Sequence, residues 1–410
     1  MLQFDHLPTG HKLLSNQGIA MKVYLDNGTT TQVAKEVLDA MLPYFTDKFG
    51  HPISVYSLGQ EAADAVEKAQ KIIARTVNAK QGEIIFTSGA TEANDIAIRG
   101  IVHATKKRGN HIITTRVENP SVLRVFEELE KEGFKVDYLD VDSQGFVNLD
   151  QLLNSINEKT ILVSVMHVND EIGTIEPIEG VGKILLEQNH KIYFHVNAAA
   201  SYARVPIDVE RMNIDAMSIS AHKIHGPKGV GALYLRENTP IEPITYGYIS
   251  LFALKPGTEN VPAIAGFGKA AELVFDDFEK HVEHMRRLRE RLMAGIEEKI
   301  QHVVLHGPRG DKRSPANVNY SFKYVEGESV LLHLDLNGIS VATGSACSTR
   351  KLEPSHVLTA IGVKPEVAHG AIRFTLSRYN TAEGIDYVLD VLPKVIENLR
   401  KISPVKPGAF

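Results

Sequence analysis

Short apolar runs alternate with amphipathic segments of helical length from residue 83 onwards. The runs are rich in β-branched residues, which is typical of strands buried on both faces of a sheet, and they lie at 83–87, 111–117, 135–141, 160–168 and 191–197. The periodicity between them predicts helices over 95–109, 121–133, 149–156 and 180–189. This alternation predicts an α/β fold with a mostly parallel sheet, helices on both faces, and ligands beyond the carboxyl ends of the strands.

The pattern changes at a long charged helix predicted over 276–300, after which strands and helices are more isolated. A chain of 410 residues is longer than one ordinary core needs. We therefore expect a large domain over 33–277. A smaller α/β domain would combine residues 22–32 with residues 278–410.

Composition and the N-terminal segment favour a cytoplasmic protein that acts on small molecules or proteins. The net charge is −5 and no long basic run occurs, which argues against a nucleic-acid or anionic-membrane surface. No stretch has the apolar length of a membrane span. Residues 1–21 lack the features of a secretory signal, so we expect a disordered tail there, with Met21 as a candidate start. The only cysteine, Cys347, cannot form an intrachain disulfide, which favours a reducing compartment.

Several segments carry side chains with chemical potential. "FTSGATEAND", at 86–95, places small residues between a strand and a helix. Either the N–H groups at the start of the helix bind a phosphate, or a Ser or Thr of a tight turn only caps the helix. Lys223 follows a β-rich run, and a partly desolvated lysine there forms Schiff bases, whereas an exposed one does not. Arg373 offers a planar fork to a carboxylate or to a surface ion pair. The small and polar neighbours of Cys347 favour an exposed nucleophile over a buried thiol.

Taken in order, the motifs resemble those of the cysteine desulfurases, pyridoxal 5'-phosphate (PLP) enzymes of the class V aminotransferase family with fold type I architecture. The resemblance runs from about residue 22 to the C-terminus and includes "VYLDNGTTT", "FTSGATEAN", "HVNDEIGTI", "SAHKIHGPKG", "PGTENVP" and "TGSACSTRKLEPSHVL". It implies a homodimer that converts L-cysteine to L-alanine and carries the sulfur as a persulfide. The acceptor would be an iron–sulfur scaffold protein or a tRNA-thiolating enzyme.

The resemblance also implies roles for individual residues. Lys223 would form the Schiff base with PLP and move protons at the substrate carbon, and Cys347 would attack the substrate sulfur as a thiolate. Arg373 would bind the substrate carboxylate. The cofactor phosphate would be held by Ala90, Thr91, Ser220 and His222, with Thr258 reaching in from the other subunit.

Positions around the expected cofactor ring depart from the family pattern. Asn197 stands where the family has an aspartate that keeps the pyridine nitrogen protonated, so the electron sink should be weaker. Asn119 replaces a histidine that stacks on the ring and acts as acid and base. Ala200 replaces a glutamine that meets the ring oxygen, and Asp170 replaces an asparagine near that oxygen. Other departures are Thr29, His51, Ile53, Tyr56 and the mostly apolar segment 246–260.

These departures leave three hypotheses open. The first is a working cysteine desulfurase with an altered ring environment. The second is a catalytically degenerate paralogue that acts as a sulfur relay or scaffold through Cys347. The third is a PLP enzyme with different amino-acid chemistry, in which the carboxylate of Asp170 serves as a base.

Overall fold

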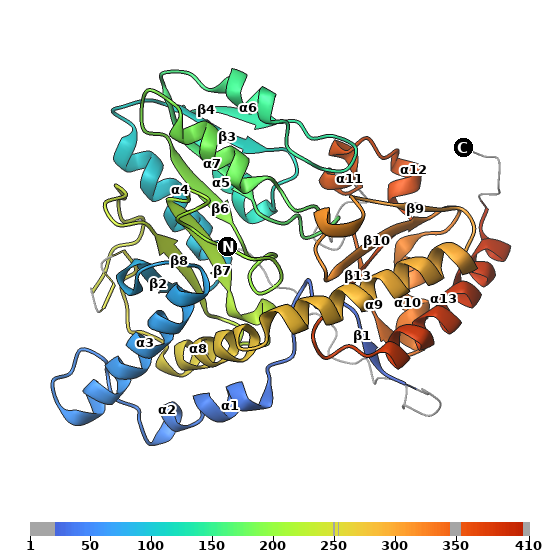
Figure 1. The fold of residues 1–410 in the computed structure, drawn as a ribbon, viewed down its shortest axis with the longest axis horizontal. Coiled ribbons are helices and arrows are strands. Elements are labelled where there is room, and N and C mark those ends of the chain that lie inside the picture. Colours follow the sequence, from blue (N-terminus) through green and yellow to red (C-terminus); the bar gives the residue numbers. More distant parts are fainter. Residues whose placement is uncertain (1–20, 249–250, 253, 345–353, 405–410) are drawn as a thin grey trace, which may run out of the picture.

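A seven-stranded sheet forms the centre of the larger part of the molecule (Figure 1). The computed structural model describes residues 21–248, 251–252, 254–344 and 354–404. The strand order is β2-β8-β7-β6-β5-β3-β4, in which β8 is antiparallel to both neighbours and the other pairs are parallel. The strands are β2 (Ile84–Thr87), β3 (His111–Thr115), β4 (Lys135–Leu139), β5 (Thr160–Met166), β6 (Tyr193–Asn197), β7 (Ala216–Ser220) and β8 (Gly231–Leu235). The predicted mostly parallel α/β sheet is thus confirmed, whereas residues 1–20 of the tail expected over 1–21 lie outside the described residues.

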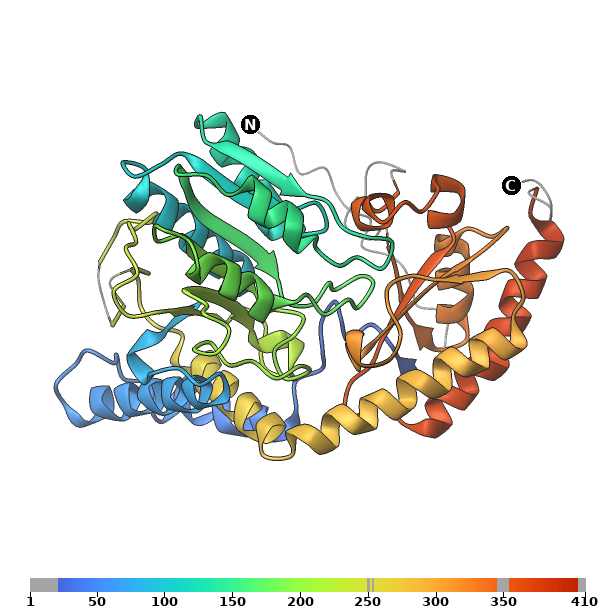
Figure 2. The same cartoon turned by 45° about the horizontal axis from the view of Figure 1, so that its top comes forward.

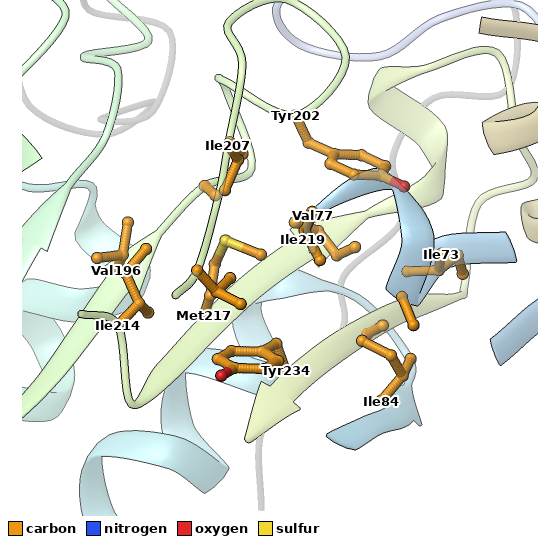
Figure 3. Packing of buried hydrophobic residues seen from close by; sticks show 14 of the residues in the cluster. Ile73, Val77, Ile84, Val196, Tyr202, Ile207, Ile214, Met217, Ile219 and Tyr234 are labelled. Carbon is orange, nitrogen blue, oxygen red and sulfur yellow. The ribbon is translucent and has the colours of Figure 1, made fainter. Parts of the chain in front are cut away.

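Helices cover both faces of this sheet and supply two apolar cores. One core packs against α3, α7 and α8, and the other against α4 and α5. Figure 3 shows part of the first core, where Ile73 and Val77 meet strand residues such as Ile219. The helices of this part are α1 (Lys35–Met41), α2 (Pro43–Thr46), α3 (Ser57–Thr76), α4 (Ala90–Thr105), α5 (Pro120–Lys131), α6 (Leu149–Ser155), α7 (Ile178–Leu186) and α8 (Val261–Phe275), with the short 3-10 turns η1 (Gln81–Glu83) and η2 (Ala221–Lys223).

A second, smaller sheet has the order β12-β13-β10-β9 and is antiparallel throughout. Its strands are β9 (Val303–Leu305), β10 (Asn317–Phe322), β12 (Ala342–Thr343) and β13 (Ala371–Thr375), and a separate parallel pair joins β1 (Val23–Tyr24) to β11 (Ile339–Ser340). The helices are α9 (Phe278–Lys299), α10 (Gly327–Leu336), α11 (His356–Ala360), α12 (Pro365–Ala368) and α13 (Ala382–Ile402), with the 3-10 turn η3 (Gly310–Lys312).

The long helix α9 leads from the larger part to the smaller one (Figure 2). Val23 and Leu25 pack into the core formed by residues after 285, so the start of the described chain lies with its C-terminal part. The domain boundaries at 22–32, 33–277 and 278–410 remain a prediction. None of the helices in the described part of the chain has the length and apolar character needed to cross a bilayer.

The strand directions bring several sequence motifs to one edge of the large sheet. Because β5, β6 and β7 are parallel, their last residues, Met166, Asn197 and Ser220, lie at the same edge. Strand β2 runs in the same direction, since both β2 and β7 are antiparallel to β8, and it delivers the N-terminus of α4 to that edge. A bridge between Asp26 and Thr375 brings the end of β13 alongside the N-terminal segment.

Candidate functional site

A cavity of about 440 Å³ lies at this carboxyl edge. Its lining includes most of the predicted site residues, namely Ala90, Thr91, Asn119, Asp170, Asn197, Ser220, His222 and Lys223. Arg373 lies beside Asp170. Thr258 is exposed in the loop before α8 and does not line the cavity. Cys347 lies outside the described residues.

One end of the cavity is suited to a phosphate. Helix α4 begins after Gly89, and no side chain caps it, so the first N–H groups of the helix face the cavity without an intrahelical partner. A side chain on Gly231 would place its Cβ 2.7 Å from the Cα of Gly89, so only glycine leaves this turn undisturbed. Ser220 adds a hydroxyl, and burial lowers the pKa of His222 to about 4, which keeps the imidazole neutral. These groups form a cradle of neutral donors for an anion.

Lys223 lies in η2, directly after β7. Its Nζ donates hydrogen bonds to the carbonyl oxygens of Gly28 and, at 3.2 Å, of Thr29. Burial is the largest influence on its pKa and lowers it to about 8, while the charge of Asp170 acts in the opposite direction. Roughly a tenth of the amine is therefore uncharged near neutral pH, far more than for an ordinary lysine, and nucleophilic attack on an aldehyde requires this form.

The floor of the cavity carries Asn197, at the end of β6. The Asn197 Oδ1 accepts a hydrogen bond from the Ala199 N–H at 3.2 Å, and its side chain lies close enough to Glu118 to lower the pKa of that carboxyl slightly. Glu118 is fully buried, and burial raises its pKa to about 8, so this carboxyl group is mostly protonated at neutral pH. The floor therefore offers an amide in front of a neutral acid where the family has a carboxylate.

Asn119 has a structural role at the start of α5. Its Oδ1 accepts hydrogen bonds from the N–H of Ser121 at 3.0 Å and from the Ser121 hydroxyl at 2.8 Å, which caps the helix. Its Nδ2 donates to the Asp170 carboxylate at 3.4 Å. The side chain thus links the helix to the cavity wall but brings no titratable proton.

Arg373, on β13, is surrounded by oxygen atoms of the chain itself. Its Nη2 donates to Thr29 Oγ1 at 2.9 Å and lies 3.4 Å from Asp26 Oδ1. Its Nη1 donates to the Asp170 carbonyl oxygen at 3.3 Å and lies 3.7 Å from the Asp170 carboxylate. Only 11% of the Arg373 side chain is exposed. The guanidinium is thus held rigidly beside the cavity.

Comparison with known proteins agrees with the motifs. The profile of the family described as aminotransferase class-V matches residues 23–388. This chain belongs to the class V aminotransferase family. Members of the family are PLP-dependent enzymes, so the predicted family, enzyme class and cofactor are confirmed.

Individual relatives of this class V aminotransferase cover almost its whole length. The cysteine desulfurase IscS of Dictyoglomus turgidum is 50% identical over 385 residues, which are 94% of this chain and 97% of the relative. The cysteine desulfurase IscS of Methanosarcina thermophila is 47% identical over 388 residues, or 95% of each chain. A solved NifS-like protein is 36% identical with a TM-score of 0.87, over 92% of this chain and 100% of its own. The structure of SspA in complex with cysteine is 34% identical with a TM-score of 0.78, over 88% and 100%.

The residues of this class V aminotransferase fit PLP at two of three points. The anion cradle around Gly89 suits the phosphate, and the Lys223 amine suits the aldehyde. At the third point, Asn197 provides an amide instead of the carboxylate that usually pairs with a protonated ring nitrogen. Binding and covalent attachment are therefore supported, and the electronic tuning of the ring differs.

Sequence reasoning missed two buried residues of the site. Arg204 donates from Nη2 to the Lys223 carbonyl oxygen at 3.0 Å and so fixes the turn that carries the lysine. No local motif marks this arginine. Glu118 directly precedes Asn119, but the sequence could not show its burial.

Proposed function

We propose that this class V aminotransferase is a cysteine desulfurase, which converts L-cysteine to L-alanine and transfers the sulfur. One observation carries the proposal: the Lys223 amine, with its lowered pKa, lines the same cavity as the anion cradle and interacts with the charge of Arg373, an arginine that suits a carboxylate. The names of the relatives that are about half identical support it. The structure of SspA in complex with cysteine supports L-cysteine as the substrate.

The residues divide the work of the reaction. Bound PLP supplies an electron sink for bonds at the substrate α-carbon. Arg373 orients the carboxylate, and the amine of Lys223 removes the α-proton and returns a proton to carbon. Cys347, as a thiolate, attacks the substrate sulfur, so that the S–S bond of a persulfide forms while the C–S bond breaks. The three-carbon fragment takes up a proton and leaves as alanine.

Partners and location belong to the same proposal. The protein would act as a cytoplasmic homodimer, with Thr258 of the partner subunit completing the phosphate site, and would pass sulfur to an iron–sulfur scaffold or a tRNA-thiolating enzyme. The exposed position of Thr258, away from the cavity of its own chain, supports a role in a second subunit. Exposed Tyr246 and Tyr248 in the preceding loop are apolar surface that an interface would cover.

The test begins with the purified protein and PLP. The visible absorption of bound PLP is recorded for the wild type, for Lys223→Ala, and for Lys159→Ala, which changes an exposed lysine before β5. We expect a band in the wild type and in Lys159→Ala that Lys223→Ala lacks. L-cysteine is then added, and sulfide and alanine are assayed together.

Each outcome assigns a function. A Lys223-dependent band with both products establishes the desulfurase. No band and no product, with Cys347 accepting a persulfide from another donor, establishes the sulfur relay instead. A band without alanine leads to other amino-acid chemistry, for which Asp170 in the cavity wall is the supporting observation.

A further inference from the structure

Two residues that differ from the family pattern contact the arginine proposed to bind the substrate carboxylate. Thr29 Oγ1 accepts a hydrogen bond from Arg373 Nη2 at 2.9 Å, and the Asp170 carboxylate lies 3.7 Å from Nη1. An alanine at position 29 would lack the hydroxyl, and an asparagine at position 170 would lack the charge. Thr29 and Asp170, which are far apart in the sequence, therefore both act on the guanidinium of Arg373.

Charged groups of both signs already surround Arg373, and the buried Glu171 carboxyl also interacts with its charge. Asp26 lies 3.4 Å from Nη2, so two carboxylates, those of Asp26 and Asp170, surround this arginine. Both carboxylates raise the pKa of the Lys223 amine. Arg204, which hydrogen bonds to the Lys223 carbonyl oxygen, adds a positive charge nearby. A substrate carboxylate would be a third anion in this space. Its arrival is opposed by the carboxylate that it meets first, which is Asp170 in the cavity wall.

Asp170 is held loosely enough to be displaced. Its carboxylate contacts are long, at 3.4 Å to Asn119 and 3.7 Å to Arg373, and 31% of the side chain is exposed. By contrast, Asp26 is only 19% exposed and its backbone bridges to β13. Of the two carboxylates, Asp170 is thus the one that can turn toward solvent.

We infer that Asp170, assisted by Thr29, is a specificity determinant that occupies Arg373 and has to be displaced by the carboxylate of an incoming amino acid. This inference rests on the proposed role of Arg373 as the carboxylate site. It means that the pocket discriminates less between an amino acid and the corresponding amine than a pocket with a neutral residue at position 170. Removing the charge should restore that discrimination.

The experiment compares L-alanine with ethylamine, which differ by the carboxylate alone. Dissociation constants are measured by calorimetric titration of the PLP-loaded protein for the wild type, Asp170→Asn, Thr29→Ala and Glu158→Gln. The last variant removes an exposed carboxylate before β5, at the opposite edge of the sheet, and is the matched control. Because binding and not turnover is measured, the result is independent of whether alanine is made from L-cysteine.

We expect Asp170→Asn to bind L-alanine about tenfold more tightly, the size of one hydrogen bond to a charged group, without a matching gain for ethylamine. Thr29→Ala should shift in the same direction by less, and Glu158→Gln should match the wild type. Unchanged, weaker or undetectable L-alanine binding to Asp170→Asn would overturn the inference. If Asp170→Asn gains affinity while no variant yields alanine from L-cysteine, the proposed function fails and the role of Asp170 stands.

Discussion

The two ends of the cavity differ in the groups that line them: backbone groups at one end and side chains at the other. The phosphate end relies on the backbone N–H groups of α4, on Gly89 and Gly231, and on neutral donors. The other end, where the PLP ring would lie, is called the ring end here. It relies on side chains, and two of them, Asn197 and Asp170, depart from the family pattern. Backbone donors are tied to the fold, so they change only when the turn changes. Side chains at the ends of strands are exchanged without altering the sheet, which is why chemistry varies at this end.

The largest expected effect on the cavity comes from a change that disrupts its phosphate end. Gly231→Val would place side-chain atoms within 2.7 Å of the Gly89 Cα and 2.6 Å of the Ile219 carbonyl oxygen, so the turn before α4 must shift. We expect the affinity for PLP to fall about 100-fold and the free energy of unfolding to fall by about 1–3 kcal/mol. Fluorescence titration with PLP and urea denaturation measure the two effects.

Gly82→Ala is the control for this change, because open space surrounds a Cβ at that position and Gly82 does not line the cavity. It should leave the phosphate end intact. Equal losses of PLP affinity in both variants would show that the close approach of Gly231 to Gly89 is not what holds the cradle.

The next effect is expected at the ring end, from a substitution at Asn197. Asn197→Asp would return a carboxylate to the floor of the cavity, where it favours a protonated ring nitrogen and a stronger electron sink. We expect the rate of alanine formation from L-cysteine at saturation to rise about tenfold, with PLP affinity changed less than twofold. Asn154→Asp, on an exposed position of α6, controls for added negative charge. A fall in the rate would contradict the weaker electron sink assigned to the amide at position 197.

The pH dependence of Lys223 connects the two ends. Burial lowers the pKa of this amine to about 8, and Asp170 raises it, so the reactive uncharged form increases as the pH rises through 8. Loss of the Asp170 charge removes a favourable partner of the ammonium, and the midpoint should move to lower pH. The rate at which cofactor-free protein reacts with added PLP, followed from pH 6 to pH 10 in wild type and Asp170→Asn, measures the shift. A midpoint that stays or rises contradicts the proposed proximity of the two charges.

The sequence predicted the scaffold better than the electrostatics of the site. The strands, the helix at 276–300 and the position of Lys223 after a strand follow from periodicity, which is a local property. The contact of Arg373 with Thr29 and Asp170 joins three distant segments, and no local pattern encodes it. The burial that shifts the pKa of Glu118 likewise depends on the packing of the whole edge. The resemblance identified the candidate residues of the site. Their protonation states and ion pairs depend on burial and on contacts that only the structure shows.

An effect on stability alone is expected behind the cavity, at Glu176. Its Oε2 accepts a hydrogen bond from the Val147 N–H at 3.0 Å, and within the described part of the chain its buried Oε1 has no hydrogen-bond partner. Burial raises the pKa of this carboxyl to about 8, above its ordinary 4.5, so the folded state holds a proton that the unfolded state releases. Stability from this group is therefore present below pH 4.5 and is lost as the pH rises to 8.

Glu176→Gln keeps the bond to Val147 and cannot ionise, so it removes this loss. We expect the variant to gain about 4–5 kcal/mol in the free energy of unfolding at pH 8.5 and less than about 1 kcal/mol at pH 5, where only the first part of the loss has set in. Urea denaturation at the two pH values measures the difference. An equal gain at both would assign the effect to packing, and Glu187→Gln, on the exposed C-cap of α7, controls for the loss of charge. A gain confined to high pH would show that the buried carboxyl of Glu176 destabilises the folded state when it ionises. The backbone donors of the phosphate end carry no such cost, because they do not ionise.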